Sequence, residues 1–166
     1  LVSLISNSIV DKLDWGCTEH YIKISFAAIF HDMALSSGSE AMIQTLSDED
    51  YNSLKFSEKG KVKKHPIEAA KYIRQIENVP DDVIKIVEQH HERFDGSGFP
   101  YGLTTERLHN LTRVFIVAHD FVVELYNYHF DSEAKEAILD KILSRYGDDK
   151  MIVPISEALK SSSSMK

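Results

Sequence analysis

The 166-residue chain is long enough to bury one hydrophobic core, and we treat it as a single domain. Hydrophobic residues make up 43% and charged residues 27%, and no apolar run approaches the roughly 20 residues of a membrane span. The formal net charge of −7 argues against binding DNA or RNA through the phosphates. The single cysteine, Cys17, cannot form an internal disulfide, so a reducing cytoplasm is the expected location.

The two ends of the chain differ in pattern. Residues 1–13 have apolar side chains at helical spacing and do not begin with methionine, so we expect an N-terminally truncated fragment of a longer protein. The domain is expected to cover residues 1–160. The serine-rich residues 161–166 are expected to form a flexible tail.

Residues 18–92 have mainly the helical period. The segment TEHYIKISFAAIFHDMAL (18–35) has apolar side chains on most faces of the expected helix. This pattern predicts a helix that is buried on most sides and ended by SSGS. Ser47 is expected to cap the next helix, and EKGKVKK (58–64) to form a solvated connection. A further helix is expected to begin at His65-Pro66, because proline is favoured in a first helical turn. VPDDVIKIVEQHHE repeats this device with Pro80 and two acids.

Glycines and a proline dominate the next segment, residues 94–109, which predicts a long loop with one helical turn at TTERL. Two more helices are expected beyond it, the second capped near Asp131 or Ser132 and ended by Gly147. Residues 114–117 and 121–123 have strand propensity, but the length of the patterned segment favours a helix. The prediction is an all-α fold, a compact single-domain helical bundle.

Histidine and aspartate are the residues that indicate chemistry. The pair His31-Asp32 ends an apolar helix, His65 begins one, and the pair His90-His91 ends another; Asp120 lies within the apolar run VFIVAHDFVV. An ionised carboxylate in such a run is costly unless a cation neutralises it. Imidazole with carboxylate suits iron, manganese or zinc better than calcium or magnesium.

Each of these positions also has a simpler explanation. A lone histidine on an apolar face is more often a core residue with a satisfied hydrogen bond, and His65 before proline can cap a helix. Asp120 can accept N–H bonds or pair with a basic side chain. Together, however, the positions predict a metal centre, in which the two oxygens of Asp32 can bridge two ions. The remaining histidines are expected to be structural or on the surface: His20, His109, His119 and His129.

The stretch HHERFDGSGFP resembles the HHExxDGxGYP signature of the HD-GYP proteins, a branch of the HD superfamily of metal-dependent phosphohydrolases. Phe99 stands in place of the signature tyrosine. The segments FHDMA, KKHPIEAA and RVFIVAHDFVVEL are similar, in the same order, to the HD motif, the HP motif and the helix with the last aspartate. The resemblance covers residues 26–125 and implies a helical bundle of the HD-domain type.

The resemblance also implies a site and an activity. Asp32 would bridge two divalent metals, usually iron or manganese, and take part in catalysis. His31 and Asp120 would bind one metal, and His65, His90 and His91 the other. Gly96, Gly98 and Phe99 would form a loop beside the substrate, tied to the helix by Glu92, Asp95 and Arg113. Family members hydrolyse cyclic di-GMP, and typically an upstream sensory domain precedes the hydrolase domain. Two cations can share a hydroxide and place it in line with a phosphorus.

Three departures from the family pattern concern the surroundings of the ligand. Leu35 replaces a lysine, Phe99 lacks the tyrosine hydroxyl, and NYHFDSE replaces a basic stretch. Two hypotheses follow. The first is a phosphodiesterase acting on cyclic di-GMP or a related cyclic dinucleotide. The second is a degenerate metal-binding receptor or docking domain of cyclic di-GMP signalling. Another HD-type phosphohydrolase and an oxygen- or redox-responsive di-iron protein also remain open.

Overall fold

The fold is described from a computed structural model, which describes residues 1–43, 49–147, 149–150, 152–154 and 157. Its helices are α1 (Val2–Lys12), α2 (Thr18–Phe30), α3 (Gly38–Ala41), α4 (Glu49–Ser53), α5 (Phe56–Ile73), α6 (Asp81–Gln89), α7 (Asn110–Asn127) and α8 (Lys135–Tyr146), with 3₁₀ turns at Thr105–Arg107 and Ser132–Ala134. Within the described residues there is no β-strand, and Asp95 and Thr104 form an isolated bridge. The predicted all-α fold is confirmed. Ser47 and the expected tail, 161–166, lie outside the described residues.

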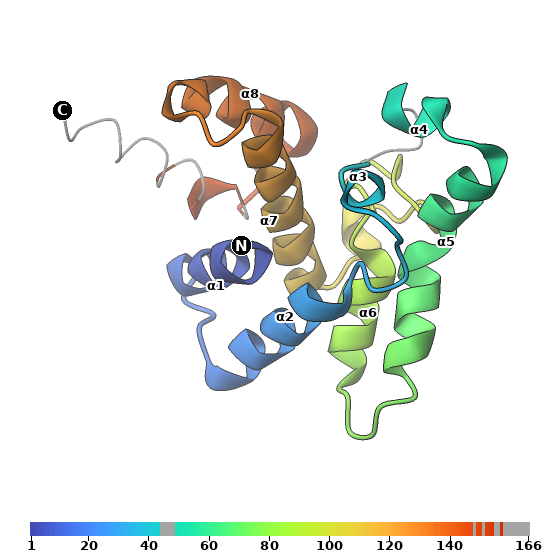
Figure 1. Ribbon diagram of the computed structural model, residues 1–166. Helices are drawn as coiled ribbons and strands as arrows, with labels where there is room; N and C mark the ends of the chain where they lie inside the picture. The colour runs from blue at the N-terminus through green and yellow to red at the C-terminus, as the bar shows by residue number, and fades with distance from the viewer. Residues whose placement is uncertain (44–48, 148, 151, 155–156, 158–166) are drawn as a thin grey trace.

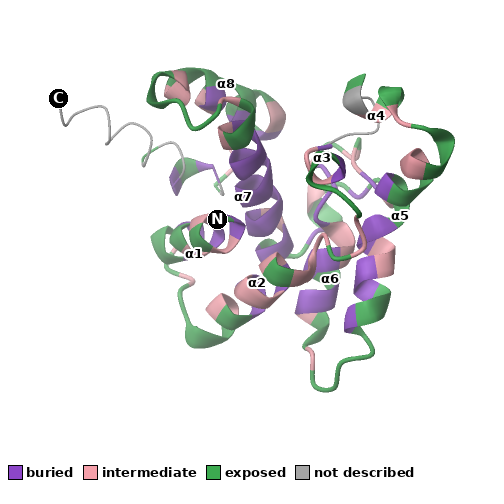
Figure 2. Ribbon diagram, in the orientation of Figure 1, coloured by how far each residue is buried: buried purple, intermediate pink, exposed green. Residues whose placement is uncertain are grey.

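Helix α7 is the centre of the molecule (Figure 1), with α1, α2, α6 and α8 packed against it. Figure 2 shows it buried along most of its length, and between Leu111 and Glu124 only Arg113 is not buried. Such all-round burial explains why strand propensity did not prevail in this segment. A buried helix leaves no backbone N–H or C=O group without a partner in its interior.

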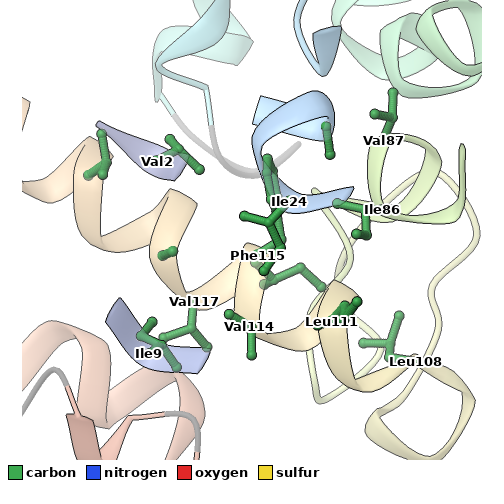
Figure 3. Packing of buried hydrophobic residues seen from close by; sticks show 14 of the residues in the cluster. Val2, Ile9, Ile24, Ile86, Val87, Leu108, Leu111, Val114, Phe115 and Val117 are labelled. Atoms are coloured by element: carbon green, nitrogen blue, oxygen red, sulfur yellow. The ribbon is translucent and has the colours of Figure 1, made fainter. Parts of the chain in front are cut away.

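One hydrophobic core joins four helices, α2, α5, α6 and α7, which also position the candidate site. Figure 3 shows Phe115 of α7 near Ile24 of α2, with Ile86 of α6 on the same side. Val117, further along α7, faces Ile9 of α1. Burial of these large aliphatic and aromatic side chains stabilises the arrangement by roughly 2 kcal/mol each. The core therefore fixes the C-terminal ends of α2 and α6 against the middle of α7.

Two local predictions need correction. Helix α5 begins at Phe56, not at His65, so the expected solvated connection is helical and Pro66 lies inside the helix. The Glu58 carboxylate accepts the Lys55 N–H at 2.8 Å and thereby stabilises this earlier start. Helix α2 is also less buried than expected, because Ile29 is 72% exposed and points away from the core.

The ends of the other predicted helices agree with the sequence signals. Pro80 precedes α6 as its N-cap, and the Asp131 side chain accepts the Glu133 N–H at the turn that leads into α8. Gly147 ends α8 with a φ of 60°, in the region where glycine carries no steric cost. Among the described residues, no helix is long and apolar enough to cross a membrane.

Candidate metal centre

Six side chains from the ends and middles of four helices converge beside the core. Asp32, His65, His90 and His91 each offer a ligand atom, all within 4.8 Å of one another, and we name these four the buried group. His31, Asp32 and His119 satisfy the same criterion, and we name them the open group. Asp32 belongs to both. The predicted cluster of histidines around Asp32 is thus present, with His119 in place of Asp120.

Three of the histidines are oriented by the same device. The Nδ1 of His31, His65 and His90 lies 3.1, 2.7 and 2.7 Å from the carbonyl oxygen of the residue three positions earlier. A carbonyl oxygen can only accept, so each Nδ1 carries the hydrogen and each Nε2 presents a lone pair. A hydrogen bond of this kind behind the ring is how proteins fix the tautomer and direction of a metal-binding imidazole.

Each of these carbonyl groups lacks its usual helical partner. The last four carbonyls of an α-helix have no intrahelical N–H donor, which frees Ala28 at the end of α2 and Val87 at the end of α6. Val62 lies inside α5, where its partner would be the amide of residue 66. That residue is proline and has no N–H, so the Val62 oxygen is available to His65. Pro66 therefore leaves a carbonyl oxygen free in the interior of α5, as the end of a helix does in α2 and α6.

The acceptor atoms of the buried group lie close together, and they have too few hydrogen-bond donors between them. The Nε2 atoms of His65 and His90 are 3.1 Å apart, and they lie 3.3 and 3.5 Å from Oδ1 of Asp32. Although these contacts are short enough for ion pairs, Oδ1 has no hydrogen bond of acceptable geometry. Both ring nitrogens of His91 and Nδ1 of His119 are likewise buried without a partner among the described residues. Converging acceptors of this kind fit a bound cation, which would satisfy them together.

The two oxygens of Asp32 face different groups. Oδ1 lies toward His65 and His90, whereas Oδ2 lies 3.2 Å from Nε2 of His31. Burial disfavours the charged carboxylate, but hydrogen bonds from His31, His65 and His90, when these rings also carry a proton on Nε2, outweigh burial and hold the Asp32 pKa below its ordinary value. Asp32 is therefore a carboxylate at neutral pH. Its two oxygens can serve two cations.

Burial keeps three imidazoles of the site, those of His90, His91 and His119, in the neutral form. Burial, reinforced by neighbouring imidazoles, lowers the pKa of His90 to about 4 despite the opposing contact with Asp32. Burial also lowers the pKa of His91 and of His119 well below the usual value, and nearby histidines add to the effect. Neutral imidazole is the form that binds a metal. The charges and donor types at this site therefore fit transition-metal ions without proton loss at pH 7.

Asp120 points elsewhere, which corrects its expected place among the metal ligands. Its Oδ2 lies 3.5 Å from Arg93 and 3.4 Å from Arg145, and it accepts the hydroxyl hydrogen of Tyr146. Two guanidinium groups neutralise this carboxylate in its apolar run. Asp120 follows His119 by one position, about 100° around the helix, and its carboxylate is directed toward Arg93 and Arg145 instead of toward the cluster.

His119 is the site residue that sequence reasoning missed. It is 3% exposed, its ring lies 5.1 Å from the His31 ring, and it stacks against Phe115 one turn earlier. The available signal was its position four residues after Phe115, on the same helical face. Since α7 is buried on all sides, apolar periodicity could not show which face meets the histidines.

The glycine-rich loop supports the buried group. Gly96 has a φ of 81°, and a Cβ at Gly98 would come within 2.5 Å of the Glu92 backbone, so both glycines are needed for the loop to lie against the helix end. The Phe99 amide donates to the His91 carbonyl at 3.0 Å, and the two rings stack 4.5 Å apart with an interplanar angle of 12°. Phe99 is 2% exposed among Ile43 and Val62. The loop thus contacts His91, and its role beside a substrate stays a prediction.

The three expected loop ties have different outcomes. Glu92 does tie the loop to the helix end, because its carboxylate accepts the amides of Tyr101 and Leu103, each at 2.7 Å. Asp95 instead accepts from the backbone and hydroxyl of Ser97, within the loop. Arg113 pairs with Asp149 and lies over the ring of Phe94.

A pocket of about 410 Å³ opens beside one of the two groups. His31, Asp32 and His119 line it, whereas His65, His90 and His91 do not. The rest of its lining is mostly apolar, with two serine hydroxyls and one tyrosine: Leu1, Val2, Ser3, Ser25, Ala28, Ile29, Ala41, Met42, Val122, Val123 and Tyr126. A ligand in this pocket would therefore reach the open group, but the buried group only through Asp32.

Comparison with known proteins agrees with this arrangement. Residues 2–148 match the family described as HD domain. Over 81 residues, 48% of this chain and 20% of the relative, the sequence is 34% identical to the cyclic di-GMP phosphodiesterase PA4108 of Pseudomonas aeruginosa. The fold resembles Bd1817, an HDG“Y”P protein from Bdellovibrio bacteriovorus, with a TM-score of 0.68 and 22% identity over 96% of this chain and 50% of that one.

An all-α bundle with clustered histidines and aspartate is the architecture of metal-dependent phosphohydrolases of the HD type. The chain belongs to the HD domain family, and Phe99 stands where the HD-GYP signature that its sequence resembles has a tyrosine. It spans a fifth of the length of the curated relative and half of the structural neighbour.

Proposed function

We propose that this domain is a metal-dependent phosphodiesterase that hydrolyses cyclic di-GMP or a related cyclic dinucleotide. The observation that carries the proposal is Asp32, whose two oxygens face two groups of imidazoles, one of them beside a pocket. Two divalent ions would be held there, iron or manganese by donor type. PA4108, the similar curated protein, is a cyclic di-GMP phosphodiesterase, which supports the choice of substrate.

The residues of the chain would have distinct tasks. His65, His90 and His91 would hold one ion, His31 and His119 the other, and Asp32 would bridge them. When bound, the ions would polarise a phosphate ester and lower the pKa of a water molecule. The apolar pocket walls would exclude bulk water around the reacting ester and strengthen these electrostatic effects.

The charge of the proposed centre favours an anionic ligand despite the acidic chain. Two divalent ions bring four positive charges, and Asp32 is the one carboxylate in the two ligand groups of the described residues. His119, a neutral ligand where an aspartate was expected, leaves the centre more positive. This excess charge is available to a phosphodiester.

A second function, a receptor or docking domain without turnover, is favoured by a specific observation. None of the described residues that line the pocket is lysine or arginine, and Leu35 occupies the position of the family's lysine. A phosphate in this pocket would have only the metals to neutralise it. Binding without efficient hydrolysis is the expected behaviour of such a site.

Turnover on cyclic di-GMP separates the two functions. The protein, loaded with Fe²⁺ or Mn²⁺, is incubated with cyclic di-GMP, and the linear dinucleotide and GMP are separated by chromatography. We expect product from the wild type and from the control Asp140→Asn, an exposed acid of α8, and a loss of roughly hundredfold or more in Asp32→Asn. Binding of cyclic di-GMP without product would support the receptor; neither binding nor product would contradict both.

Other parts of the proposal concern the whole protein. We place it in the cytoplasm, supported by the single, exposed and unpaired Cys17. An upstream sensory domain and protein signalling partners are also proposed. Residues 1–160 are proposed to be the metal-binding domain.

A further inference from the structure

We infer that the two metal positions are unequal: the buried group retains its ion, whereas the open group exchanges its ion and controls binding of the phosphate ligand. The inference rests on the proposed two-metal site and adds a form of regulation to it. Protein with one ion would be folded but unable to bind phosphate. Protein with two ions would be competent.

The buried group has the features of a closed site. It offers four ligand residues, the number that closed structural sites typically supply. The side chains of His65 and His90 are 0% exposed, and His91 is 3% exposed beneath the Phe99 ring. An ion leaving this group would have to pass Asp32 on the side of the pocket, or displace packed side chains or the loop that Glu92 holds. Slow release and high affinity follow.

Orientation of the rings adds to this difference. His65 and His90 are held by hydrogen bonds of 2.7 Å to carbonyl oxygens, and His91 by the stacked Phe99. Their ligand atoms therefore lose little freedom when an ion binds. Preorganisation of this kind raises affinity because the ordering cost was met on folding.

The open group has fewer and less constrained ligands. It offers three residues, and all three line the pocket. The His31 hydrogen bond to Ala28 is longer, at 3.1 Å, and Nδ1 of His119 has no partner among the described residues. Three protein ligands and access to a pocket are the features of a catalytic metal position with room for water or substrate. Such a position can also lose its ion into the pocket.

Both metal positions share Asp32, and the open position depends on this residue more than the buried position does. The buried group has three imidazoles of its own and does not need Oδ2 of Asp32. The open group depends on that oxygen, because its other ligands are only His31 and His119. A phosphate oxygen entering the pocket reaches the ion of the open group first. Occupancy of this position, and hence the free metal concentration, would therefore set the capacity to bind phosphate.

A metal titration tests the inference directly. Metal-free protein is titrated with Mn²⁺ by calorimetry, and the metal that survives gel filtration is measured by elemental analysis. We expect two binding steps, the second weaker by roughly tenfold or more, and one equivalent retained. Inorganic phosphate, titrated into each form, should bind only after the second step. Two steps of equal affinity, or equal phosphate binding by the one-metal form, would overturn the inference.

Variants assign the steps to the groups. His119→Ala should remove the weak step and keep the retained equivalent, whereas His65→Ala should lose the retained equivalent. His109→Ala, which removes an exposed histidine at the start of α7, is the matched control and should leave both steps intact. Loss of the retained equivalent in His119→Ala, with helicity preserved, would contradict the assignment. If either variant does not fold, the two-step titration of the wild type still decides.

The outcome is independent of turnover. Two unequal steps without hydrolysis of cyclic di-GMP would leave this inference standing and remove the proposed enzyme activity. Hydrolysis with two equal steps would do the reverse.

Discussion

Two regions of the molecule bury carboxylates, and they satisfy them in opposite ways. Between α7 and α8, Asp120 and Glu124 are surrounded by donors: Arg145 contacts both, and Arg93 reaches Asp120. In the candidate metal centre, Asp32 is surrounded by acceptors, since the Nε2 lone pairs of three histidines face it. A buried acid is therefore not by itself a sign of metal. The balance of donors and acceptors around it is the sign.

The largest effect is expected where the donors lie. Asp120→Asn removes the charge that neutralises Arg93 and Arg145, and a buried ion pair broken on one side costs about 3 kcal/mol of unfolding free energy. Urea denaturation measures the loss. Metal content per folded molecule should not change, because Asp120 faces away from the cluster. A drop in metal content with the fold intact would mean that Asp120 is a ligand after all.

Acid should destabilise the metal-free protein through the region of acceptors. Burial lowers the pKa of His90 from 6.5 to about 4, so between these values the unfolded chain binds a proton that the folded chain does not. Stability contributed by the neutral ring is complete above pH 6.5 and is lost as pH falls toward 4. From pH 7 to pH 5, His90 alone should cost about 2 kcal/mol. Denaturation at both pH values checks this, and an unchanged midpoint would contradict it.

Pro66→Ala should separate metal binding from stability. Alanine restores an N–H that competes with His65 for the Val62 carbonyl, so the imidazole loses its fixed direction and metal affinity should fall roughly tenfold. The helix itself should become no less stable, because alanine is the better helix residue. Calorimetry with Mn²⁺ and thermal denaturation measure the two quantities. Equal affinity in variant and wild type would show that Pro66 does not orient His65.

The smallest effect is expected for Phe99→Leu. Leucine keeps the apolar contacts with Ile43 and Val62 but removes the ring stacked on His91, which costs about 1 kcal/mol. The visible spectrum of bound Co²⁺ should change as His91 shifts, whereas Tyr101→Leu, a change at an exposed ring of the same loop, should leave it as in the wild type. An unchanged spectrum in Phe99→Leu would remove the proposed support of His91.

The sequence predicted most helices and most of the clustered side chains, but not all of them. Helical periodicity and capping signals identified α1, α2, α6, α7 and α8, and the spacing of His31, Asp32, His65, His90 and His91 identified five of the six clustered side chains. It failed at α5, because a proline preceded by a charged stretch has the pattern of a helix start. Only tertiary contacts show that Pro66 lies mid-helix and frees a carbonyl.

The sequence predicted Asp120 in place of His119 as the site residue of α7, for a different reason. In a helix buried on all sides, neighbouring residues are equally apolar in their surroundings, and a shift of one position changes which region a side chain enters. The arginines that neutralise Asp120 come from the segment after α6 and from α8, 27 residues before and 25 after it, so no local pattern reveals them.

Diffraction from crystals of the Mn²⁺-loaded protein, recorded at the manganese absorption edge, tests the central claim most directly. Two anomalous peaks are predicted on opposite sides of Asp32, one contacted by His65, His90 and His91 and the other by His31 and His119. A peak at Asp120, or no peak at Asp32, would contradict the account.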